Sequence, residues 1–332
     1  MIRRHVLLAA CAALPLIANV QAQAQAQAQP APNWPTKPVR ILTPFPAGAG
    51  PETVLRVLAE KLGKAWGQPV VVENKPGGNG FIAIDAFKRG DKEGYDLIQV
   101  DNVHLTAYPS LFKKLPYDPQ NDFELVAPLF KASFFFAVPV NSPYKTVGDL
   151  VADAKSKPGK LNYGSWSIGN PVHLGSALFE SLTGTQMEHV VYKETSMLYT
   201  GVANGELAFA LGSSGTSGGL QRAGKLRYLA VAGPKRLAGY PDVPTVGESG
   251  GPASFEVTGW TALATPKGLN PAIVQKIRRD IEKALAEPDI AQRYTTFGYE
   301  VFPTTPPQFA AFVKSETAKQ AEVIKKANVS LD

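Results

Sequence analysis

The fold prediction begins with the segment Ile41-Leu42-Thr43-Pro44-Phe45-Pro46-Ala47-Gly48-Ala49-Gly50-Pro51-Glu52-Thr53. A short apolar strand over residues 39–42 leads into a loop of Pro, Gly and Ala, and apolar residues then recur at helical spacing from Val54 to Ala65. The loop therefore opens a helix, where unpaired backbone N–H groups lie at the positive end of the helix dipole. Because glycine and alanine let a ligand approach the backbone closely, this loop predicts a carboxylate-binding site.

Two common phosphate-binding motifs do not fit this loop. The run Gly48-Ala49-Gly50-Pro51-Glu52-Thr53 lacks the third glycine of the dinucleotide fingerprint, and Glu52 would face the pyrophosphate. It also lacks the Gly-Lys-Ser/Thr ending of a P-loop. An ordinary strand-to-helix turn stays open as the alternative, because such a turn alone does not fix a function.

The N-terminus has the pattern of a secretion signal. Arg3 and Arg4 precede an apolar run over residues 6–20, which is too short to span a bilayer. Cleavage after Ala22 fits the small-x-small rule, so residues 1–22 are predicted to be a signal peptide. The mature protein is therefore expected in the periplasm.

The only cysteine, Cys11, offers a second export route. It ends Leu8-Ala9-Ala10-Cys11, which has the shape of a lipoprotein cleavage box, but cleavage there leaves an apolar core of only five residues. Export without lipidation is the preferred interpretation. Residues 23–33, which are rich in Gln, Ala and Pro, are predicted to be a low-complexity linker.

The composition of the mature chain limits its partners. Without Arg3 and Arg4 it carries 32 basic and 28 acidic residues, a net charge of +4, which suits an anionic ligand. No dense Lys/Arg stripe with interleaved aromatic residues indicates nucleic acid. About 310 residues remain after cleavage, enough for two domains that are stabilised by their apolar cores without disulfides.

Two further strand–loop–helix units follow the first helix. A buried strand at 70–72 leads into the glycine-rich loop 73–80, and a strand at 95–100 leads into Asp101 and Asn102. Such units in series predict a doubly wound, mostly parallel sheet. Ligands of these sheets lie beyond the carboxyl ends of the strands, where these loops are expected.

The middle of the chain has the same pattern of strand, small-residue loop and helix, and it is predicted to form a second lobe. An apolar strand at 134–138 precedes a helix that Thr146 caps. The loop 164–170 then reads Gly-Ser-Trp-Ser-Ile-Gly-Asn, with Asn170 as the N-cap and Pro171 as the first helical residue. Two such loops on opposing lobes would clamp an anion from both sides.

The rest of the chain extends both predicted lobes. Strands at 189–192 and 207–211 flank a helix at 196–204, and the Gly/Ser run 212–219 either lines a cleft or is a flexible, solvated connection. A strand at 258–263 returns to the first lobe. Three C-terminal helices are expected to begin near Pro271, Pro288 and Pro306.

Short motifs recur in a fixed order after Trp34. They are Pro35-x-Lys37-Pro38-Val39-Arg40, Pro44-Phe45-Pro46-Ala47-Gly48, Val72-Glu73-Asn74-Lys75-Pro76-Gly77-Gly78-Asn79-Gly80, Leu115-Pro116-Tyr117-Asp118-Pro119, Pro158-Gly159-Lys160-Leu161-Asn162-Tyr163-Gly164-Ser165, Pro171-x-His173-Leu174, Val191-Tyr192-Lys193 and Gly224-Lys225-Leu226-Arg227-Tyr228-Leu229-Ala230-Val231. In order and spacing they resemble the Bug proteins, the TctC-like extracytoplasmic solute receptors associated with tripartite tricarboxylate transporters.

The resemblance implies a two-lobed α/β fold with the type II periplasmic binding protein architecture. Each lobe would be a mostly parallel sheet flanked by helices, with the ligand cleft between the lobes. Residues 34–132 and 258–332 would form the first lobe and residues 133–257 the second, with the hinge near Ala132 and Val257. The protein would be a monomer and not an enzyme, without cofactor or nucleic acid.

The resemblance also implies a ligand and the residues that hold it. The ligand would be a small carboxylate, either a di- or tricarboxylate or an aromatic acid, delivered to the membrane transporter subunits or to a sensor. The first-lobe loop would contribute Phe45, Ala47, Gly48, Ala49 and Glu52. The second-lobe loop and its helix would contribute Ser165, Trp166, Ser167, Asn170 and His173. Asn102 and Tyr192 would face the far end of the ligand.

Some of these residues have two interpretations or depart from the family pattern. Trp166 would either stack on a flat aromatic acid or pack across the domain boundary. Glu52 and Glu93 stand where the family usually has Asp, and Ala208 stands where it often has Asp. Ala208 keeps open the possibility of a scaffold whose cleft has lost its ligand.

The main alternative function is an exported hydrolase of small esters or amides that uses a serine of residues 164–170. Ser165-Trp166-Ser167-Ile168-Gly169 is the nearest match to a nucleophile elbow, but serine replaces its first glycine. His173 follows on the helix and either donates to a ligand or stabilises the loop. No metal site is predicted, because His104, His173 and His189 are far apart and no mature cysteine joins them.

Overall fold

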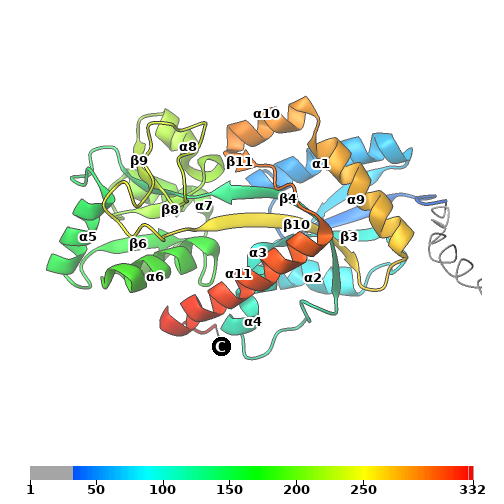
Figure 1. Ribbon diagram of the computed structural model, residues 1–332, viewed down its shortest axis with the longest axis horizontal. Helices are drawn as coiled ribbons and strands as arrows, with labels where there is room; N and C mark the ends of the chain where they lie inside the picture. The colour runs from blue at the N-terminus through cyan, green and yellow to red at the C-terminus, as the bar shows by residue number, and fades with distance from the viewer. Residues whose placement is uncertain (1–32, 328, 332) are drawn as a thin grey trace, which may run out of the picture.

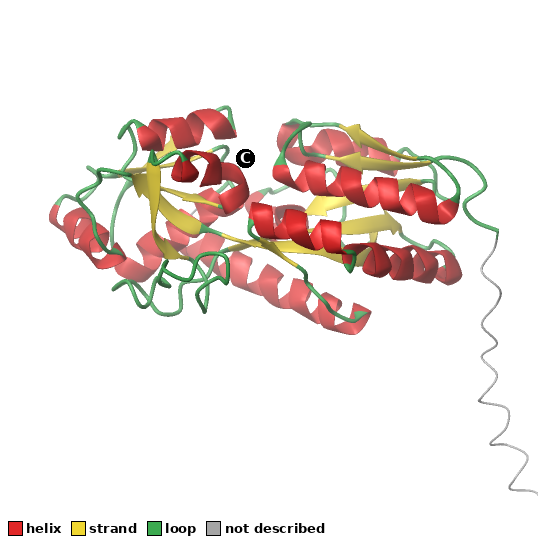
Figure 2. Cartoon of the chain, turned by 90° about the horizontal axis from the view of Figure 1, so that it is seen from above, coloured by secondary structure: helices red, strands yellow, loops and turns green. Residues whose placement is uncertain are grey.

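The structure is a computed structural model that describes residues 33–327 and 329–331 (Figure 1). Two lobes lie side by side along the longest axis of the molecule, and strands run between them (Figure 2). The predicted two-lobed α/β fold is confirmed. The predicted signal peptide, the Cys11 anchor and nearly all of the linker at 23–33 lie outside the described residues.

The first lobe is built on a six-stranded sheet with the order β11-β4-β10-β3-β1-β2. Its strands are β1 (Val39–Thr43), β2 (Val70–Asn74), β3 (Asp96–Asp101), β4 (Phe123–Ser133), β10 (Thr258–Pro266) and β11 (Tyr299–Glu300). β1 is parallel to β2 and β3, whereas β10 is antiparallel to both β3 and β4, and β11 is antiparallel to β4. The prediction of a mostly parallel sheet is therefore wrong for this lobe. The reason is that β10 returns from the second lobe and so runs against its neighbours.

Helices cover both faces of this sheet. One face carries α1 (Gly50–Trp66), α9 (Pro271–Leu285) and α10 (Pro288–Phe297), whose buried residues include Leu55, Leu58 and Ile277. These leucines recur at helical spacing, so one side of α1 faces the core, as the sequence predicts. The other face carries η1 (Gly78–Gly80), α2 (Phe81–Lys88), α3 (Asn102–Thr106), α4 (Tyr108–Leu111) and α11 (Pro306–Ala327).

The second lobe contains two small sheets. β5 (Phe135–Pro139) lies between β8 (Ala210–Gly212) and β9 (Leu226–Val231) and is antiparallel to both. β6 (Asn162–Ser165) pairs in parallel with β7 (Glu188–Val191). The strands of this lobe are therefore also mixed rather than mostly parallel. Its helices are α5 (Val147–Ser156), α6 (Pro171–Thr183), α7 (Thr195–Ala203) and α8 (Ser214–Arg222).

The Gly/Ser run at 212–219 is not the flexible connection of one interpretation of the sequence, because it ends β8 and forms most of α8. Ser217 is buried, and its hydroxyl hydrogen-bonds with that of Tyr228 at 2.9 Å. Gly218 is also buried, and a Cβ there would lie 3.0 Å from the guanidinium of Arg222. Small side chains thus let α8 pack closely, and this packing overrides the low helix propensity of glycine.

α11 contacts both lobes. It packs on α3, α4 and β4 of the first lobe and on α6 of the second (Figure 1). Its Ile324 belongs to an apolar cluster with Val103 of α3, Leu111 of α4 and Leu174 of α6. Beyond the helix, the backbone N–H of Leu331 donates to the carbonyl of Leu111 at 3.0 Å. The lobes are therefore held together along this side, while α8 and α10 meet elsewhere in the interface.

None of the helices within residues 33–327 and 329–331 has the length and apolar character needed to cross a membrane.

Candidate functional site

The loop after β1 is fixed at its base and open at its tip. Asn74, the last residue of β2, donates from Nδ2 to the carbonyl of Phe45 at 2.9 Å. Residues 46–48 at the tip are exposed. Gly48 has φ +81°, a left-handed conformation that suits glycine, and nothing lies within 4 Å of a Cβ built there. A ligand can therefore approach this part of the backbone.

The Glu52 side chain binds one of the backbone N–H groups that were predicted to hold the ligand. Its side chain is only 1% exposed, and Oε2 accepts a hydrogen bond from the backbone N–H of Gly48 at 2.9 Å. The other oxygen, Oε1, accepts from Nε of Arg56. The Gly48 N–H is thus used within the protein, and the Glu52 charge is balanced by the guanidinium.

The first turn of α1 keeps its own donors. The N-cap residue is Ala49, which has no side-chain oxygen, and no side chain caps this helix. Pro51 has no N–H, so the donors of this turn are the amides of Gly50 and Glu52. No described residue accepts a hydrogen bond from either amide. The positive end of the helix dipole is therefore uncapped beside the open loop.

Tyr299 borders this helix start, and sequence reasoning missed it. A Cβ built on Gly50 would collide with the Tyr299 hydroxyl, and one built on Gly215 of α8 would lie 3.5 Å from it. The hydroxyl therefore lies between the N-termini of α1 and α8, which belong to opposite lobes. The local sequence around Tyr299 has no motif, because the residue reaches the loop only through the pairing of β11 with β4.

In the second lobe, Ser165 is held inside the loop. Its side chain is fully buried, and Oγ donates to the carbonyl of Ser167 at 2.8 Å. Nε2 of His189 lies 2.8 Å from the same Oγ. Because the serine proton goes to Ser167, the imidazole donates to the hydroxyl, which is the reverse of a nucleophile–base pair. This geometry gives no support to the hydrolase alternative.

Asn170 and His173 also hold the loop. Oδ1 of Asn170 accepts from the N–H groups of Val172 at 2.7 Å and His173 at 3.0 Å, which is the predicted N-cap. Nδ1 of His173 accepts from the backbone N–H of Gly169 at 3.0 Å. These side-chain atoms therefore shape the backbone of the loop.

Burial lowers the pKa of both histidines of this lobe, which favours the neutral form of each ring. The rings of His173 and His189 stack with centroids 4.1 Å apart. Burial, followed by the neighbouring His189, lowers the pKa of His173 to about 4, and burial lowers the pKa of His189. Two neutral rings can stack face to face without charge repulsion.

The exposed part of the second loop is its centre. Ile168 is 43% exposed and Ser167 is half-buried. No described residue accepts a hydrogen bond from the backbone N–H of Ser167 or Ile168. Trp166 is half-buried and packs against both apolar clusters of the second lobe. The backbone amides of Ser167 and Ile168 are thus free donors of this loop, whereas the side chains of Ser165 and Asn170 bond within it. The ligand contact of the Ser167 side chain stays a prediction.

The remaining candidates lie at two separate places. Asn102 is 3% exposed at the start of α3, between the lobes, and its Oδ1 has no hydrogen-bond partner among the described residues. Tyr192 packs in the second lobe, and its hydroxyl donates to Glu206 Oε2 at 3.2 Å.

Asp101 directly precedes Asn102 at the start of α3. Burial raises the pKa of the Asp101 carboxyl to about 7.

The two loops contact different parts of the opposite lobe. A Cβ on Gly169 would lie 2.9 Å from Leu111 of α4 and 3.0 Å from Leu331, so the second loop faces the α4 side. The start of α1 faces Tyr299 of its own lobe, whose hydroxyl also lies near Gly215 of α8. Within the described chain, no hydrogen bond or ion pair joins residues 44–52 to residues 164–170.

No group of three or more His, Cys, Asp or Glu side chains that could hold a metal ion occurs among residues 33–327 and 329–331. The polar groups of the site are therefore helix N-termini, backbone amides and buried hydroxyl groups.

A sequence model described as the tripartite tricarboxylate transporter family receptor, TctC, matches residues 54–329. The chain belongs to this family. The predicted resemblance to Bug and TctC-like receptors is thereby confirmed, and the family consists of solute-binding receptors, not enzymes.

Curated relatives match nearly the whole TctC chain. A UPF0065 protein in the gbd 5'region of Cupriavidus necator is 33% identical over 301 residues, which is 90% of this chain and 90% of the relative. Protein BugT of Bordetella pertussis is 28% identical over 302 residues, covering 91% of this chain and 92% of BugT.

Two solved structures of similar proteins carry small carboxylates. R. palustris Rpa4515 with adipate superposes with a TM-score of 0.82 at 27% identity, covering 90% of this chain and 99% of that one. MatC from Rhodopseudomonas palustris with bound malate gives a TM-score of 0.78 at 26% identity, covering 88% of this chain and 100% of MatC. Both neighbours are similar to this TctC receptor along its length.

Proposed function

We propose that this receptor binds a small carboxylate between its lobes in the periplasm and delivers it to the membrane subunits of a tripartite tricarboxylate-type transporter. The observation that carries the proposal is the uncapped start of α1. Ala49 leaves the amides of Gly50 and Glu52 without a described acceptor, next to a loop that is open at Gly48. A carboxylate supplies the missing acceptor and the negative charge that the helix dipole favours.

Two kinds of residue take part in this proposed site. The backbone amides of Gly50, Glu52, Ser167 and Ile168 donate to the ligand, and Phe45 and Trp166 contribute apolar walls. The side chains of Glu52, Ser165, Asn170 and His173 do not contact the ligand, because their polar atoms already hold the two loops in place.

The lobes close by differential contact. We place the lobe boundaries at residues 132/133 and 257/258, with residues 306–332 in the first lobe and in contact with the second. A ligand that touches both lobes stabilises the closed arrangement over the open one by the free energy of the contacts it makes only there. The receptor acts as a monomer, so closure needs no second copy.

The similar proteins narrow the ligand class. Malate is a four-carbon dicarboxylate and adipate is a six-carbon dicarboxylate, and each is bound in the structure of a similar protein. A dicarboxylate has two charged ends, and in this proposal the backbone amides of each lobe bind one of them.

Thermal denaturation with and without ligand tests the proposal. The purified mature protein is heated with adipate, malate, a tricarboxylate, an aromatic acid, or the neutral dimethyl ester of adipate as the control. A ligand at a hundredfold excess over its dissociation constant adds about 2.7 kcal/mol of stability. A rise in melting temperature with an acid but not with its ester supports the proposal. No rise with any of the acids, or an equal rise with the ester, contradicts it.

A further inference from the structure

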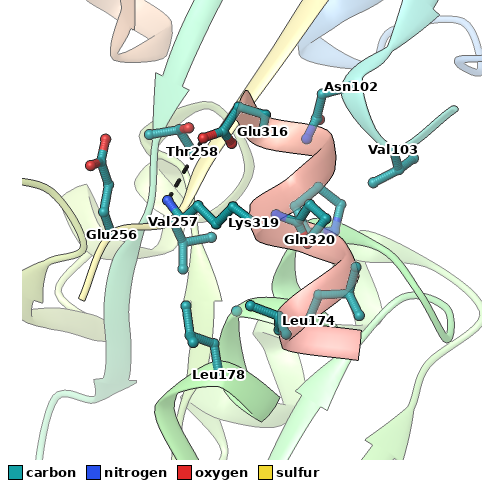
Figure 3. Close-up of a pocket in the computed structure, with 13 residues that line it drawn as sticks. Asn102, Val103, Leu174, Leu178, Glu256, Val257, Thr258, Glu316, Lys319 and Gln320 are labelled. Carbon is teal, nitrogen blue, oxygen red and sulfur yellow. Dashed lines mark ion pairs between the residues drawn. The ribbon is translucent and has the colours of Figure 1, made fainter. Parts of the chain in front are cut away.

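A small cavity lies where three parts of the fold meet. It has a volume of about 20 Å³ and is bounded by α3 of the first lobe, by α6 and the start of β10, and by α11. Figure 3 shows Asn102 at one end, Leu174 and Leu178 at the other, and the side chains of α11 between them. The cavity is therefore enclosed by both lobes and by the helix that contacts both.

Two amide oxygens at this cavity are buried without a partner. Asn102 Oδ1 and Gln320 Oε1 are both inaccessible, and neither receives a hydrogen bond from any described residue. Both residues line the cavity, and Asn102 is only 3% exposed. A buried oxygen without a donor loses its hydration and gains nothing in return, so such groups in proteins usually have a water partner.

The charged residues at the cavity already have partners. Lys319 Nζ lies 3.8 Å from Glu316 Oε1 (Figure 3). Glu256 Oε1 lies 3.4 Å from Nζ of Lys131 on β4. The buried groups without a partner at this cavity are therefore two acceptors, and a molecule that satisfies both must donate two hydrogen bonds. Two amide oxygens are too few for a hard cation such as Ca²⁺, which takes six to eight oxygen ligands.

The volume identifies the donor. A water molecule needs roughly 10–15 Å³ of such space, so the cavity of about 20 Å³ has space for one water. Water is also the smallest neutral molecule that donates twice.

We propose that one ordered water occupies this cavity and bridges Asn102 Oδ1 to Gln320 Oε1. The bridge fastens the start of α3 to α11 at the point where α11 packs on α6 of the second lobe. Asn102 thereby acts as a positioning residue in the lobe junction instead of contacting the transported ligand. The proposal is independent of which ligand the receptor binds.

A high-resolution crystal structure of the mature protein tests the water directly. The expected result is one density peak within hydrogen-bond distance of both oxygens. An empty cavity, or an amide that turns its oxygen towards a protein donor, overturns the proposal.

Urea denaturation of Gln320→Leu and Asn102→Leu tests the energetics. If the water bridges the two oxygens, each variant removes one of its partners, and the urea midpoint falls. If the cavity is dry, each variant removes a buried oxygen that lacked a donor, and the midpoint stays or rises. Ser315→Leu, on an exposed position of the same helix, controls for placing leucine in α11.

The double variant Asn102→Leu/Gln320→Leu completes the cycle. Through a shared water, the fall in midpoint of the double variant is smaller than the sum of the two single effects. Strictly additive effects mean that the two amides do not share a partner, and the proposal is then wrong even if each single variant is destabilised.

Discussion

Glu52 Oε2 accepts a hydrogen bond from the backbone N–H of Gly48 at 2.9 Å, so the side chain reaches back to the loop that precedes its own helix. This contact determines which amides of the loop remain for a ligand. It also explains how the receptor tolerates an acidic side chain beside an anion site, because Arg56 binds the second carboxylate oxygen.

Replacing Glu52 separates its charge from its geometry. Glu52→Ala leaves the Gly48 N–H and the Arg56 guanidinium without their acceptor, and we expect a loss of about 1–3 kcal/mol in the free energy of unfolding. Glu52→Gln keeps one carbonyl oxygen and is expected to lose less. Urea denaturation measures both variants. Equal stability of wild type and Glu52→Ala would show that the contact contributes nothing.

Ala49→Asp tests whether the start of α1 is the anion site. Ala49 has φ −66° and ψ 146°, which is the conformation of an N-cap residue. An aspartate there accepts from the first-turn amides, and we expect the protein to gain about 0.5–2 kcal/mol of stability. The same carboxylate occupies the ligand's place, so isothermal titration calorimetry should show at least a tenfold weaker affinity for the acid. The neutral cap Ala49→Asn is the matched control. Unchanged ligand affinity in Ala49→Asp would place the site elsewhere.

Ser165→Ala tests the role of the buried hydroxyl. The change leaves the Ser167 carbonyl and the His189 N–H without a partner, and we expect a destabilisation of about 1–3 kcal/mol. Ester hydrolysis by the wild type and the variant, followed with p-nitrophenyl acetate, should be at the background rate in both. Turnover that disappears in the variant would restore the hydrolase alternative.

The buried histidines make the protein sensitive to acid. The pKa of His173 is about 4 in the folded protein against an ordinary value of 6.5, so the unfolded chain binds more protons between these two values. Stability therefore falls as the pH decreases from 6.5 to about 4, by up to about 3 kcal/mol for this group, and is constant above 6.5 with respect to it. Denaturant midpoints measured across this range should fall less steeply in His173→Gln. His189→Gln should flatten the profile as well, because burial also lowers the pKa of His189 and because His189 contributes to the lowered pKa of His173. A profile that is flat in the wild type, or identical in His173→Gln, contradicts this assignment.

Asp101 is expected to change the stability with pH in the opposite direction to the histidines, so the two effects on the free energy of unfolding can be measured separately. Burial raises its pKa to about 7, so its folded form holds a proton that the unfolded form releases above its ordinary value of 3.8. Its contribution to stability is full below 3.8 and is lost as the pH rises to about 7. Asp101→Asn should therefore improve the denaturant midpoint at pH 8 relative to pH 4, compared with the wild type. The same pH difference in both proteins would show that the carboxyl titrates normally.

The Tyr299 hydroxyl fills the space beside Gly50 that a larger side chain at position 50 would need. A methyl group at position 50 would collide with the Tyr299 hydroxyl, so we expect Gly50→Ala to cost about 1–3 kcal/mol. Tyr299→Phe removes the oxygen and leaves the ring carbon 3.4 Å from the new methyl group, which is an ordinary contact. The double variant should therefore be more stable than Gly50→Ala alone, as thermal unfolding would show. If Tyr299→Phe gives no rescue, the collision is not the cause.

Local rules predicted the parts of the fold that depend on nearby residues. Thr146 and Asn170 cap their helices as expected, because a cap needs only its own side chain and the next two or three amides. The strand directions were not predictable in this way, since β10 takes its direction from a return across the molecule. α8 also depended on distant contacts, because Tyr228 lies on the next strand.

The candidate site shows the same division. The two loops were found from their small residues and following helices, but their internal bonds were not. Ser165 meets His189 through the pairing of β6 with β7, and Tyr299 reaches Gly50 from the far edge of the first sheet. The residues next to these positions in the sequence contain no motif that predicts either contact. For this reason residue type alone assigned Ser165 and Asn170 to the ligand, whereas both are engaged in shaping the loop.

The contact of α11 with both lobes limits the directions in which they can separate. Rotation that widened the α6–α11 side would have to expose Leu174 and Ile324 to water, which costs hydrophobic free energy. The lobes should therefore swing apart on the α8–α10 side, with the α11 side as the axis. Fluorophores or spin labels on α8 and α10 would report this swing as a large change in distance, and a pair on α6 and α11 would remain almost constant.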